Sequence, residues 1–208
     1  MGDEVATVGL LPADCGVTGT RRRVLDAALD LFATRGYAGA SIRDIADGAG
    51  IRSASLYDLF PSKAHILAAV VTIGHEMLLA GLRAAIAEAG DDPVERVRAL
   101  VRADVIGHAR FPTLAIVTNT ELDRLPDDLR EEPMRLRNEA ALLALDVAMA
   151  GAADGVFDLP HPGPTLAAIG SMCLRVPHWF TPSADYSAEQ LADDYADLAL
   201  RMLAPRTR

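Results

Sequence analysis

Apolar residues recur at steps of three and four along most of the chain, which is the spacing of amphipathic helices. The pattern predicts a first helix over residues 20–35 and a short second helix that begins after Ser41. Ser41 and Asp44 have the spacing of a capping box, in which each side chain bonds to the other residue's backbone N–H. Gly50 supplies the positive φ of a tight turn, and a third short helix is expected over residues 52–59. This order of elements is typical of a helix-turn-helix, whose second helix enters a DNA groove.

The rest of the chain also has helical spacing and shows no alternating strand pattern. We therefore predict an all-α protein with an N-terminal three-helix helix-turn-helix DNA-binding domain and a C-terminal helical ligand-binding and dimerisation domain. The predicted divisions are a disordered tail over residues 1–19, the helix-turn-helix over 20–66 and the C-terminal domain over 67–208. The helices expected beyond the helix-turn-helix cover residues 62–89, 91–110, 113–122, 126–150, 163–176 and 188–203.

The helix expected over 163–176 is nearly apolar all round, so it must be buried on several sides. A monomer of 208 residues has too little protein to cover it, and its small residues permit close approach of another helix. Together with the last helix it predicts a four-helix homodimer interface; a thick intramolecular core is the alternative. The predicted interface residues are Ala167, Gly170, Ser171, Leu174, Leu191, Tyr195, Leu198 and Met202.

Charge is distributed unevenly along the chain. The formal net charge is −9, yet residues 20–65 hold seven basic and five acidic side chains and are net +2. Positive charge is thus concentrated where DNA would bind, and the remainder of the molecule repels it. The run Arg21, Arg22 and Arg23 is either a solvated face or a set of contacts to phosphates or the minor groove.

Residues 20–66, TRRRVLDAALDLFATRGYAGASIRDIADGAGIRSASLYDLFPSKAHI, resemble the N-terminal domain of the TetR (tetracycline-repressor) family of transcription factors. The resemblance implies phosphate and base contacts from the second helix, base contacts from the start of the third, and phosphate contacts by an aromatic hydroxyl and a lysine. Compared with the family pattern, the basic residue before the recognition helix is displaced by one position. The aromatic could instead be a structural contact, and the lysine could simply be solvated. With the arginine run, the implied DNA-binding residues are Arg21, Arg22, Arg23, Ser41, Arg43, Arg52, Ser53, Ala54, Ser55, Tyr57 and Lys63.

Several polar side chains fall within the apolar helical pattern of the C-terminal part. Such groups mark either a ligand site or a satisfied structural network. Residues 175–189 resemble, loosely, a branch of the family that senses acyl-CoA or steroid-derived CoA esters. In that case Arg135, Arg137 and Arg175 would hold a phosphate or carboxylate, or would instead pair with the surplus acids. The candidate ligand-binding residues are His108, Phe111, Thr118, Asn119, Glu121, Arg175, His178 and Trp179.

Other classes of protein are disfavoured by the sequence. No Gly-rich phosphate loop, GxSxG or HExxH motif occurs, so we expect no enzyme and no cofactor. No two histidines have a chelating helical spacing, so no metal is expected. The absence of a run of 18 apolar residues and of a signal peptide, together with two isolated cysteines, predicts a cytoplasmic protein.

The sequence thus predicts a homodimeric, ligand-responsive DNA-binding regulator. The resemblance implies a repressor that a small apolar or acyl-type effector, such as an acyl-CoA, releases from a palindromic operator. The alternatives are a helical small-molecule-binding protein without DNA binding, or an enzyme.

Overall fold

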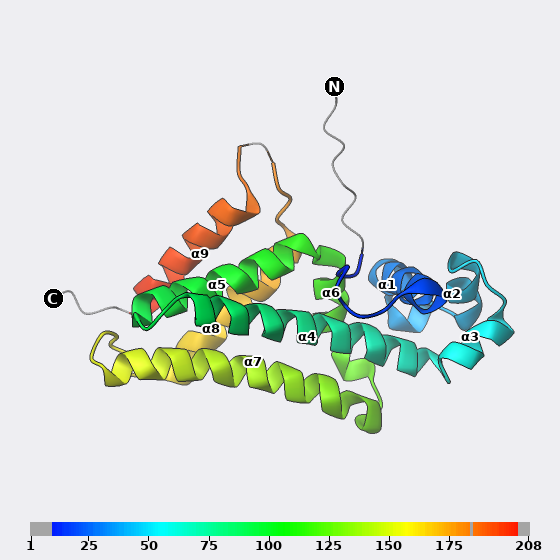
Figure 1. Cartoon of the computed structure of the whole chain (residues 1–208), viewed down its shortest axis with the longest axis horizontal. Coiled ribbons are helices and arrows are strands. Elements are labelled where there is room, and N and C mark those ends of the chain that lie inside the picture. The colour runs from blue at the N-terminus through cyan, green and yellow to red at the C-terminus, as the bar shows by residue number, and fades with distance from the viewer. Residues whose placement is uncertain (1–9, 184, 204–208) are drawn as a thin grey trace.

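The computed structural model describes residues 10–183 and 185–203, and this part of the chain is all-α, as predicted. The helix-turn-helix lies at one end of an elongated molecule and the other helices form a bundle beside it (Figure 1). The helices lie close to their predicted ranges, because their caps are local sequence features. They are α1 (Gly19–Gly39), α2 (Ile42–Gly48), α3 (Ser53–Leu59), α4 (Lys63–Glu88), α5 (Pro93–Arg110), α6 (Pro112–Thr120), the 3₁₀ turn η1 (Leu122–Arg124), α7 (Asp127–Ala153), α8 (Pro162–Arg175), the 3₁₀ turn η2 (Val176–His178) and α9 (Ala188–Met202).

The helix ends of the DNA-binding domain follow from single residues. The backbone of α1 leaves helical geometry at Gly36, where φ is 70°. Ser41 caps α2: its Oγ accepts from the Asp44 N–H at 3.1 Å, and Asp44 Oδ2 accepts from the Ser41 N–H at 3.2 Å. Gly50, with φ 67°, makes the turn into α3. Glycine adopts this left-handed conformation without the steric cost that a side chain would add.

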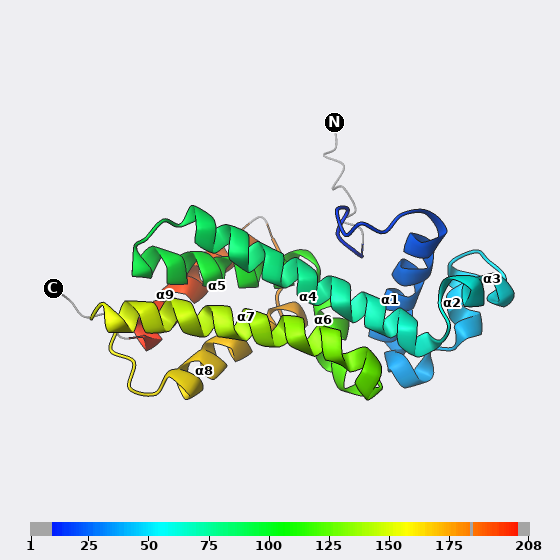
Figure 2. The ribbon, with the colours of Figure 1, turned by 60° about the horizontal axis from the view of Figure 1, so that its bottom comes forward.

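Two hydrophobic clusters make up the core, and α4 belongs to both. The first cluster packs α1–α3 against the start of α4 and includes Leu114 and Val117 of α6. The second packs the end of α4 with α5, α7, α8 and α9. The predicted division at residue 66 therefore falls inside α4, and the first cluster extends along this helix to Ile73. Figure 2 shows α4 and α7 side by side along the length of the molecule.

Within the described residues, α4 is the one helix long and apolar enough to cross a membrane by length and composition alone. Half of its most apolar stretch is buried inside the protein, against both clusters. Core packing therefore accounts for its composition.

The segment before α1 was predicted to be disordered, but its residues 10–17 fold back onto the helix-turn-helix. The Leu11 side chain is only 1% exposed and is part of the first cluster. Arg22 fixes the backbone there, donating to the carbonyl oxygens of Leu11 at 2.6 Å and Pro12 at 2.8 Å. Residues 1–9 of the predicted tail lie outside the described residues.

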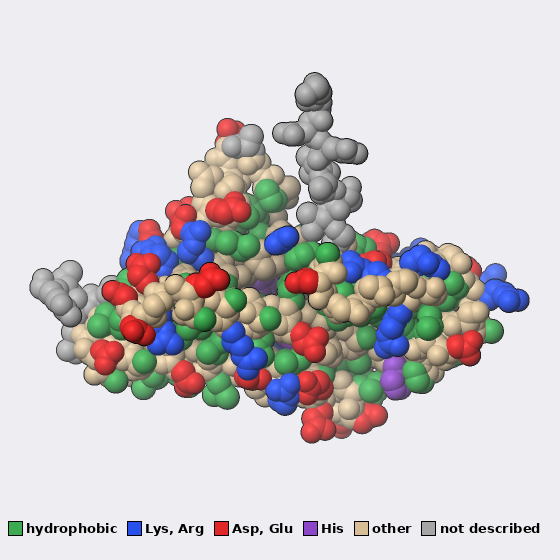
Figure 3. Space-filling model, viewed as in Figure 1, with side chains coloured by type: hydrophobic (Ala, Val, Ile, Leu, Met, Phe, Trp, Pro, Cys, Tyr) green, Lys and Arg blue, Asp and Glu red, His purple; other side chains and the backbone are tan. Residues whose placement is uncertain are grey.

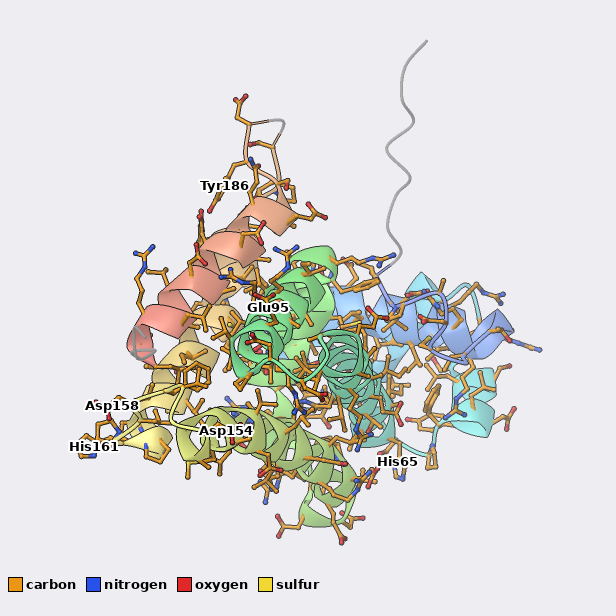
Figure 4. All side chains as sticks on the ribbon, turned by 60° about the vertical axis from the view of Figure 1, so that its left-hand side comes forward. His65, Glu95, Asp154, Asp158, His161 and Tyr186 are labelled. Carbon is orange, nitrogen blue, oxygen red and sulfur yellow. The ribbon has the colours of Figure 1, made fainter. Side chains whose placement is uncertain are left out.

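The last helix lies along α5, and this contact corrects one prediction. Leu191 was expected at a dimer interface, but it is 1% exposed and packs in the second cluster. Ion pairs hold the two helices together, Arg98 to Asp197 at 2.7 Å and Arg102 to Asp193. Tyr186 lies beside the first turns of α9 (Figure 4), where its hydroxyl donates to Asp194 at 2.7 Å.

Candidate nucleic-acid interface and core cavity

The third helix presents a face free of intramolecular packing. Leu56 anchors α3 in the core, whereas the Tyr57 side chain is 54% exposed and Arg52 and Ala54 are also exposed. Arg52 is the N-cap residue, so its side chain leaves the helix at the end that enters a groove in a helix-turn-helix. Lys and Arg side chains lie on this end of the molecule, while Asp and Glu side chains gather at the start of α7 (Figure 3).

The remaining DNA-binding candidates of α2 and α3 differ in how exposed their side chains are and in whether they have partners inside the protein. Arg43 is largely exposed, with its carboxylate partner Asp47 at 3.9 Å, and is free to reach a phosphate. Ser41 is engaged in the α2 cap, where its hydroxyl lies 2.7 Å from Asp44 Oδ2. Ser53 and Ser55 are half-buried at the start of α3.

The three consecutive arginines have separate internal roles. Arg22 holds the N-terminal segment on α1, because the backbone oxygens of Leu11 and Pro12 and the Asp26 carboxylate accept from its guanidinium. Arg21 stacks over the Phe60 ring, 4.2 Å from its centroid. Arg23 donates to the carbonyl oxygen of Ala49 at 3.2 Å. Arg21 and Arg23 are exposed and keep further donors for DNA.

Lys63, the only lysine of the chain, joins α4 to the end of α1. Its Nζ donates to the carbonyl oxygens of Tyr37 and Ala40, at 2.7 Å each, and lies 4.3 Å from the centre of the Tyr37 ring. Two of its three N–H donors are thereby used inside the protein. One donor remains for the phosphate contact that the resemblance implied.

This internal role leads to a first prediction. Lys63→Met keeps the aliphatic stem but leaves the two carbonyl groups without their charged donor. We expect the free energy of unfolding to fall by about 2–3 kcal/mol, since hydrogen bonds to charged groups contribute about 1.5–3 kcal/mol. Urea unfolding monitored by circular dichroism measures this. An unchanged midpoint would show that Lys63 has no structural role.

A small cavity lies between α4, α5 and α6. Its volume is ≈ 20 Å³, and three predicted ligand-binding residues, His108, Thr118 and Asn119, line it. It also contains His75, which sequence analysis missed because a single histidine in the apolar pattern of α4 gives no motif. The remaining lining residues are Gly74, Met77, Leu78, Gly107, Leu114 and Ala115.

Hydrogen bonding in the cavity is incomplete. His108 Nδ1 lies 2.8 Å from the backbone oxygen of Asp104 and 2.9 Å from its carboxylate, and its Nε2 lies 3.4 Å from Asn119 Nδ2. By contrast, His75 Nε2 and Thr118 Oγ1 are buried and have no hydrogen-bond partner among the described residues.

The two histidines differ in their electrostatic surroundings. Burial, together with nearby Arg137 and His108, lowers the pKa of His75 to about 4, so this imidazole is neutral at pH 7. Burial alone would lower the pKa of His108, but the adjoining Asp104 carboxylate raises it above the usual value. Lys and Arg are absent from the residues described as lining the cavity.

The other candidate ligand-binding residues lie elsewhere. Arg175 and His178 are exposed, and the Trp179 side chain is 56% exposed. Phe111 packs against the first cluster, and Glu121 lies near Gly36 of α1. The sequence placed all five in the pocket as polar or aromatic side chains within the apolar helical pattern. The fold instead leaves three of them exposed, packs Phe111 against the first cluster and places Glu121 near α1.

Arg135, a candidate anion-binding residue, is already paired. It donates to Glu132 at 2.6 Å and to Glu139 at 2.9 Å on the surface of α7. This is the alternative in which it neutralises surplus acids. Within residues 10–183 and 185–203, no group of three or more His, Cys, Asp or Glu side chains could hold a metal ion.

The predicted dimer helices leave apolar surface uncovered. On α8, Ile169 and Cys173 are buried, whereas Ala167, Ala168 and Ser171 are exposed and Gly170 and Leu174 are half-buried. On α9, Leu198 and Met202 are exposed and Tyr195 is half-buried. An exposed apolar face on neighbouring helices is typical of a protein–protein contact.

A helix-turn-helix with an exposed recognition helix, attached to a helical bundle that contains a polar cavity, defines a DNA-binding regulator with a separate sensing domain. Residues 24–70 match the family model for bacterial regulatory proteins of the tetR family, and residues 90–203 match that for the tetracyclin repressor-like C-terminal domain. The chain belongs to the TetR family of transcriptional regulators.

Individual relatives agree with this assignment. The HTH-type transcriptional repressor KstR2 of Mycolicibacterium smegmatis is 30% identical over 183 residues, which are 86% of this chain and 88% of that protein. A tetR-family regulatory protein from Rhodococcus RHA1 has a TM-score of 0.84 at 28% identity, over 92% of this chain and 100% of that chain. The ketosteroid transcriptional regulator KstR2 of Mycobacterium tuberculosis has a TM-score of 0.81 at 25% identity, over 92% of this chain and 97% of that chain.

Proposed function

We propose that the protein is a repressor that binds a palindromic DNA operator as a homodimer and leaves it when a small apolar or acyl-type effector binds the core. The observation that carries this proposal is the exposed face of α3, with Arg52 and Tyr57 outward, on a chain whose α8 and α9 also leave an apolar face uncovered. Two such subunits related by a two-fold axis would present two recognition helices to successive major grooves.

The effector would act through α4 and α6, which line the cavity and also pack in the first cluster. The 26 residues of α4 make a rod about 39 Å long at about 1.5 Å per residue, so a small tilt is magnified at its DNA end. The half-sites lie about 34 Å apart, and a shift of a few ångströms breaks one set of contacts. Linkage then requires that the effector bind the DNA-free protein more tightly than the DNA-bound protein, by the same factor by which it weakens DNA binding.

The class of effector is supported by chemistry and by relatives. The cavity is mostly apolar with a few polar atoms, as in small-molecule sites. The solved relative from M. tuberculosis is a ketosteroid regulator by name. An acyl-CoA would need its phosphates held outside the cavity, and Arg137 and Arg175 are the exposed candidates for this.

We assign no catalytic role and no cofactor, and we place the protein in the cytoplasm, where a repressor meets the chromosome. The alternative of a binding protein without DNA contact is disfavoured by the intact α2–α3 unit. A gel shift with the DNA upstream of its own gene separates the two, because a binding protein without DNA contact gives no shifted band.

A second prediction divides base reading from phosphate contact. Arg52→Ala should weaken operator binding by about 1–3 kcal/mol and relax the preference at one base pair, if Arg52 reads a guanine. Tyr57→Phe should weaken binding to all sequences alike and lower the salt dependence. Fluorescence anisotropy with single-base operator variants at several salt concentrations measures both. A uniform loss for Arg52→Ala would assign it to a phosphate instead.

A further inference from the structure

Some polar side-chain atoms of the core cavity have hydrogen-bond partners and others have none. Both ring nitrogens of His108 have partners, Asp104 at Nδ1 and Asn119 at Nε2. His75 Nε2 and Thr118 Oγ1 have no partner in the described part of the chain, although His75 is 3% and Thr118 4% exposed. A buried polar group without a hydrogen bond is destabilising, so two in one cavity point to a missing partner.

Size limits what that partner is. A cavity of ≈ 20 Å³ accommodates about one water molecule, for which roughly 10–15 Å³ is needed. A larger molecule can place one polar atom where the water would sit. The helices must then move apart to accommodate the rest of the molecule.

Charge limits it further. His75 is neutral, and His108 lies against the Asp104 carboxylate, so a protonated His108 and Asp104 together carry no net positive charge. None of the described lining residues is Lys or Arg, and the nearby Arg137 is an exposed side chain of α7 that does not line the cavity. A carboxylate or phosphate buried there would therefore lack a cationic partner inside the cavity, which is very costly, whereas burial of a hydrogen-bonded, uncharged oxygen avoids this cost.

Hydrogen-bonding capacity indicates the kind of oxygen. A neutral imidazole offers an N–H at Nε2 in one tautomer, and the threonine hydroxyl offers an O–H. A carbonyl oxygen has two lone pairs and accepts both. The two side chains line the cavity from α4 and α6, so an oxygen that accepted from both would contact both helices at once.

We propose that His75 and Thr118 bind one uncharged carbonyl oxygen of the effector, which replaces a single water, and that any charged group of the effector stays outside the cavity. This inference rests on the proposed function only because it calls the ligand an effector. In it, His75 and Thr118 select a ligand with a neutral carbonyl group over an anionic ligand.

The test uses three matched probes titrated by calorimetry at pH 7: trans-1-decalone, its 1-methylene analogue and decahydro-1-naphthoate. We expect the ketone to bind about 25-fold more tightly than the methylene analogue, the combined factor for two ordinary neutral hydrogen bonds of about fivefold each. The carboxylate should bind most weakly. Equal binding of ketone and methylene analogue, tighter binding of the carboxylate, or no binding by any probe would overturn the proposal.

Variants assign the preference to the named atoms. Thr118→Ala and His75→Leu should each reduce the ketone's advantage to about fivefold, whereas Thr118→Ser, which keeps the hydroxyl, should retain it in full. The matched control is Thr120→Val, because the exposed Thr120 lies on the same helix and bonds to the backbone oxygen of Ile116 at 2.9 Å. An undiminished ketone advantage in both Thr118→Ala and His75→Leu would contradict the assignment.

Gel shifts with the upstream DNA, run on the same samples, keep the two proposals apart. A reduced ketone preference in Thr118→Ala and His75→Leu, with intact DNA binding by both variants, supports the assignment of the two side chains. DNA that fails to shift with the wild-type protein contradicts the repressor function, while the probe ratios still decide the site.

Discussion

Gly170→Arg is expected to convert the protein to a monomer and to weaken operator binding at least about a hundredfold. Gly170 lies on α8 beside the exposed Ala167 and Ser171, and a side chain built there meets nothing within 4 Å inside the subunit. A Cβ at this position therefore fits without displacing atoms of the monomer, but the arginine would bury an unpaired charge in a helix–helix interface. Loss of the second recognition helix removes the avidity of two linked sites, which amounts to about 10²–10⁴ in affinity.

Light scattering at micromolar concentration and anisotropy with operator DNA measure the two effects. Gly81→Arg on α4 is the matched control, because Gly81 is exposed and, as at Gly170, an added Cβ meets nothing within 4 Å. This variant should stay dimeric. A dimeric Gly170→Arg protein would place the interface elsewhere, for example on α7, where Leu142 and Met149 are exposed.

Gly74→Ala is expected to lower both stability and operator affinity in the absence of effector. An added Cβ at Gly74 would overlap Thr118 Oγ1 and lie 3.0 Å from Thr118 Cγ2 and 3.1 Å from its Cβ. Threonine is branched at Cβ and cannot swing aside, so α6 must move away from α4. We expect a loss of about 1–3 kcal/mol in the free energy of unfolding, as for other overpacked cores. Because an effector would separate the same helices, operator affinity should fall about tenfold, within the usual range of allosteric coupling.

Two further variants test this explanation. Gly81→Ala, where nothing opposes the new methyl group, should raise stability by up to about 1 kcal/mol through helix propensity. Adding Thr118→Ala to Gly74→Ala should restore most of the loss, since it removes Oγ1 and Cγ2, the two atoms nearest to the added methyl group. Thermal unfolding measures the stability and anisotropy measures the operator affinity. An unchanged operator affinity in Gly74→Ala would show that the contact between Gly74 and Thr118 is not part of the allosteric switch.

The prediction of the helix-turn-helix succeeded because its signals are local. The Ser41–Asp44 cap and the turn at Gly50 involve residues a few positions apart, and the structure has both at the predicted places. Helix ranges in the C-terminal domain were predictable for the same reason: Asp92, for example, caps α5, accepting from the Val94 N–H at 2.8 Å. Family membership also followed from this stretch, since the pattern is continuous in sequence.

The role of individual polar residues was less predictable. Arg22 and Lys63 have the charge of DNA contacts, yet both also donate to backbone carbonyl oxygens distant in sequence. Arg22 donates to Leu11, 11 residues away, and Lys63 donates to Tyr37, 26 residues away. Leu191 fits a dimer stripe by spacing, but the side of α9 that meets α5 depends on how the helices pack. His75 carries no sequence signal at all, because its importance arises only where three helices meet.

The sequence by itself determined the all-α class, the helix boundaries, the helix-turn-helix and the family, because these depend on periodicity, caps and turns within a few residues. Only the tertiary structure decided that residues 10–17 pack on α1, which arginines are engaged internally, and that His75 and Thr118 share a cavity with unused donors. Those features depend on contacts between helices distant in sequence, and an amphipathic pattern specifies that a face is buried without specifying what it meets.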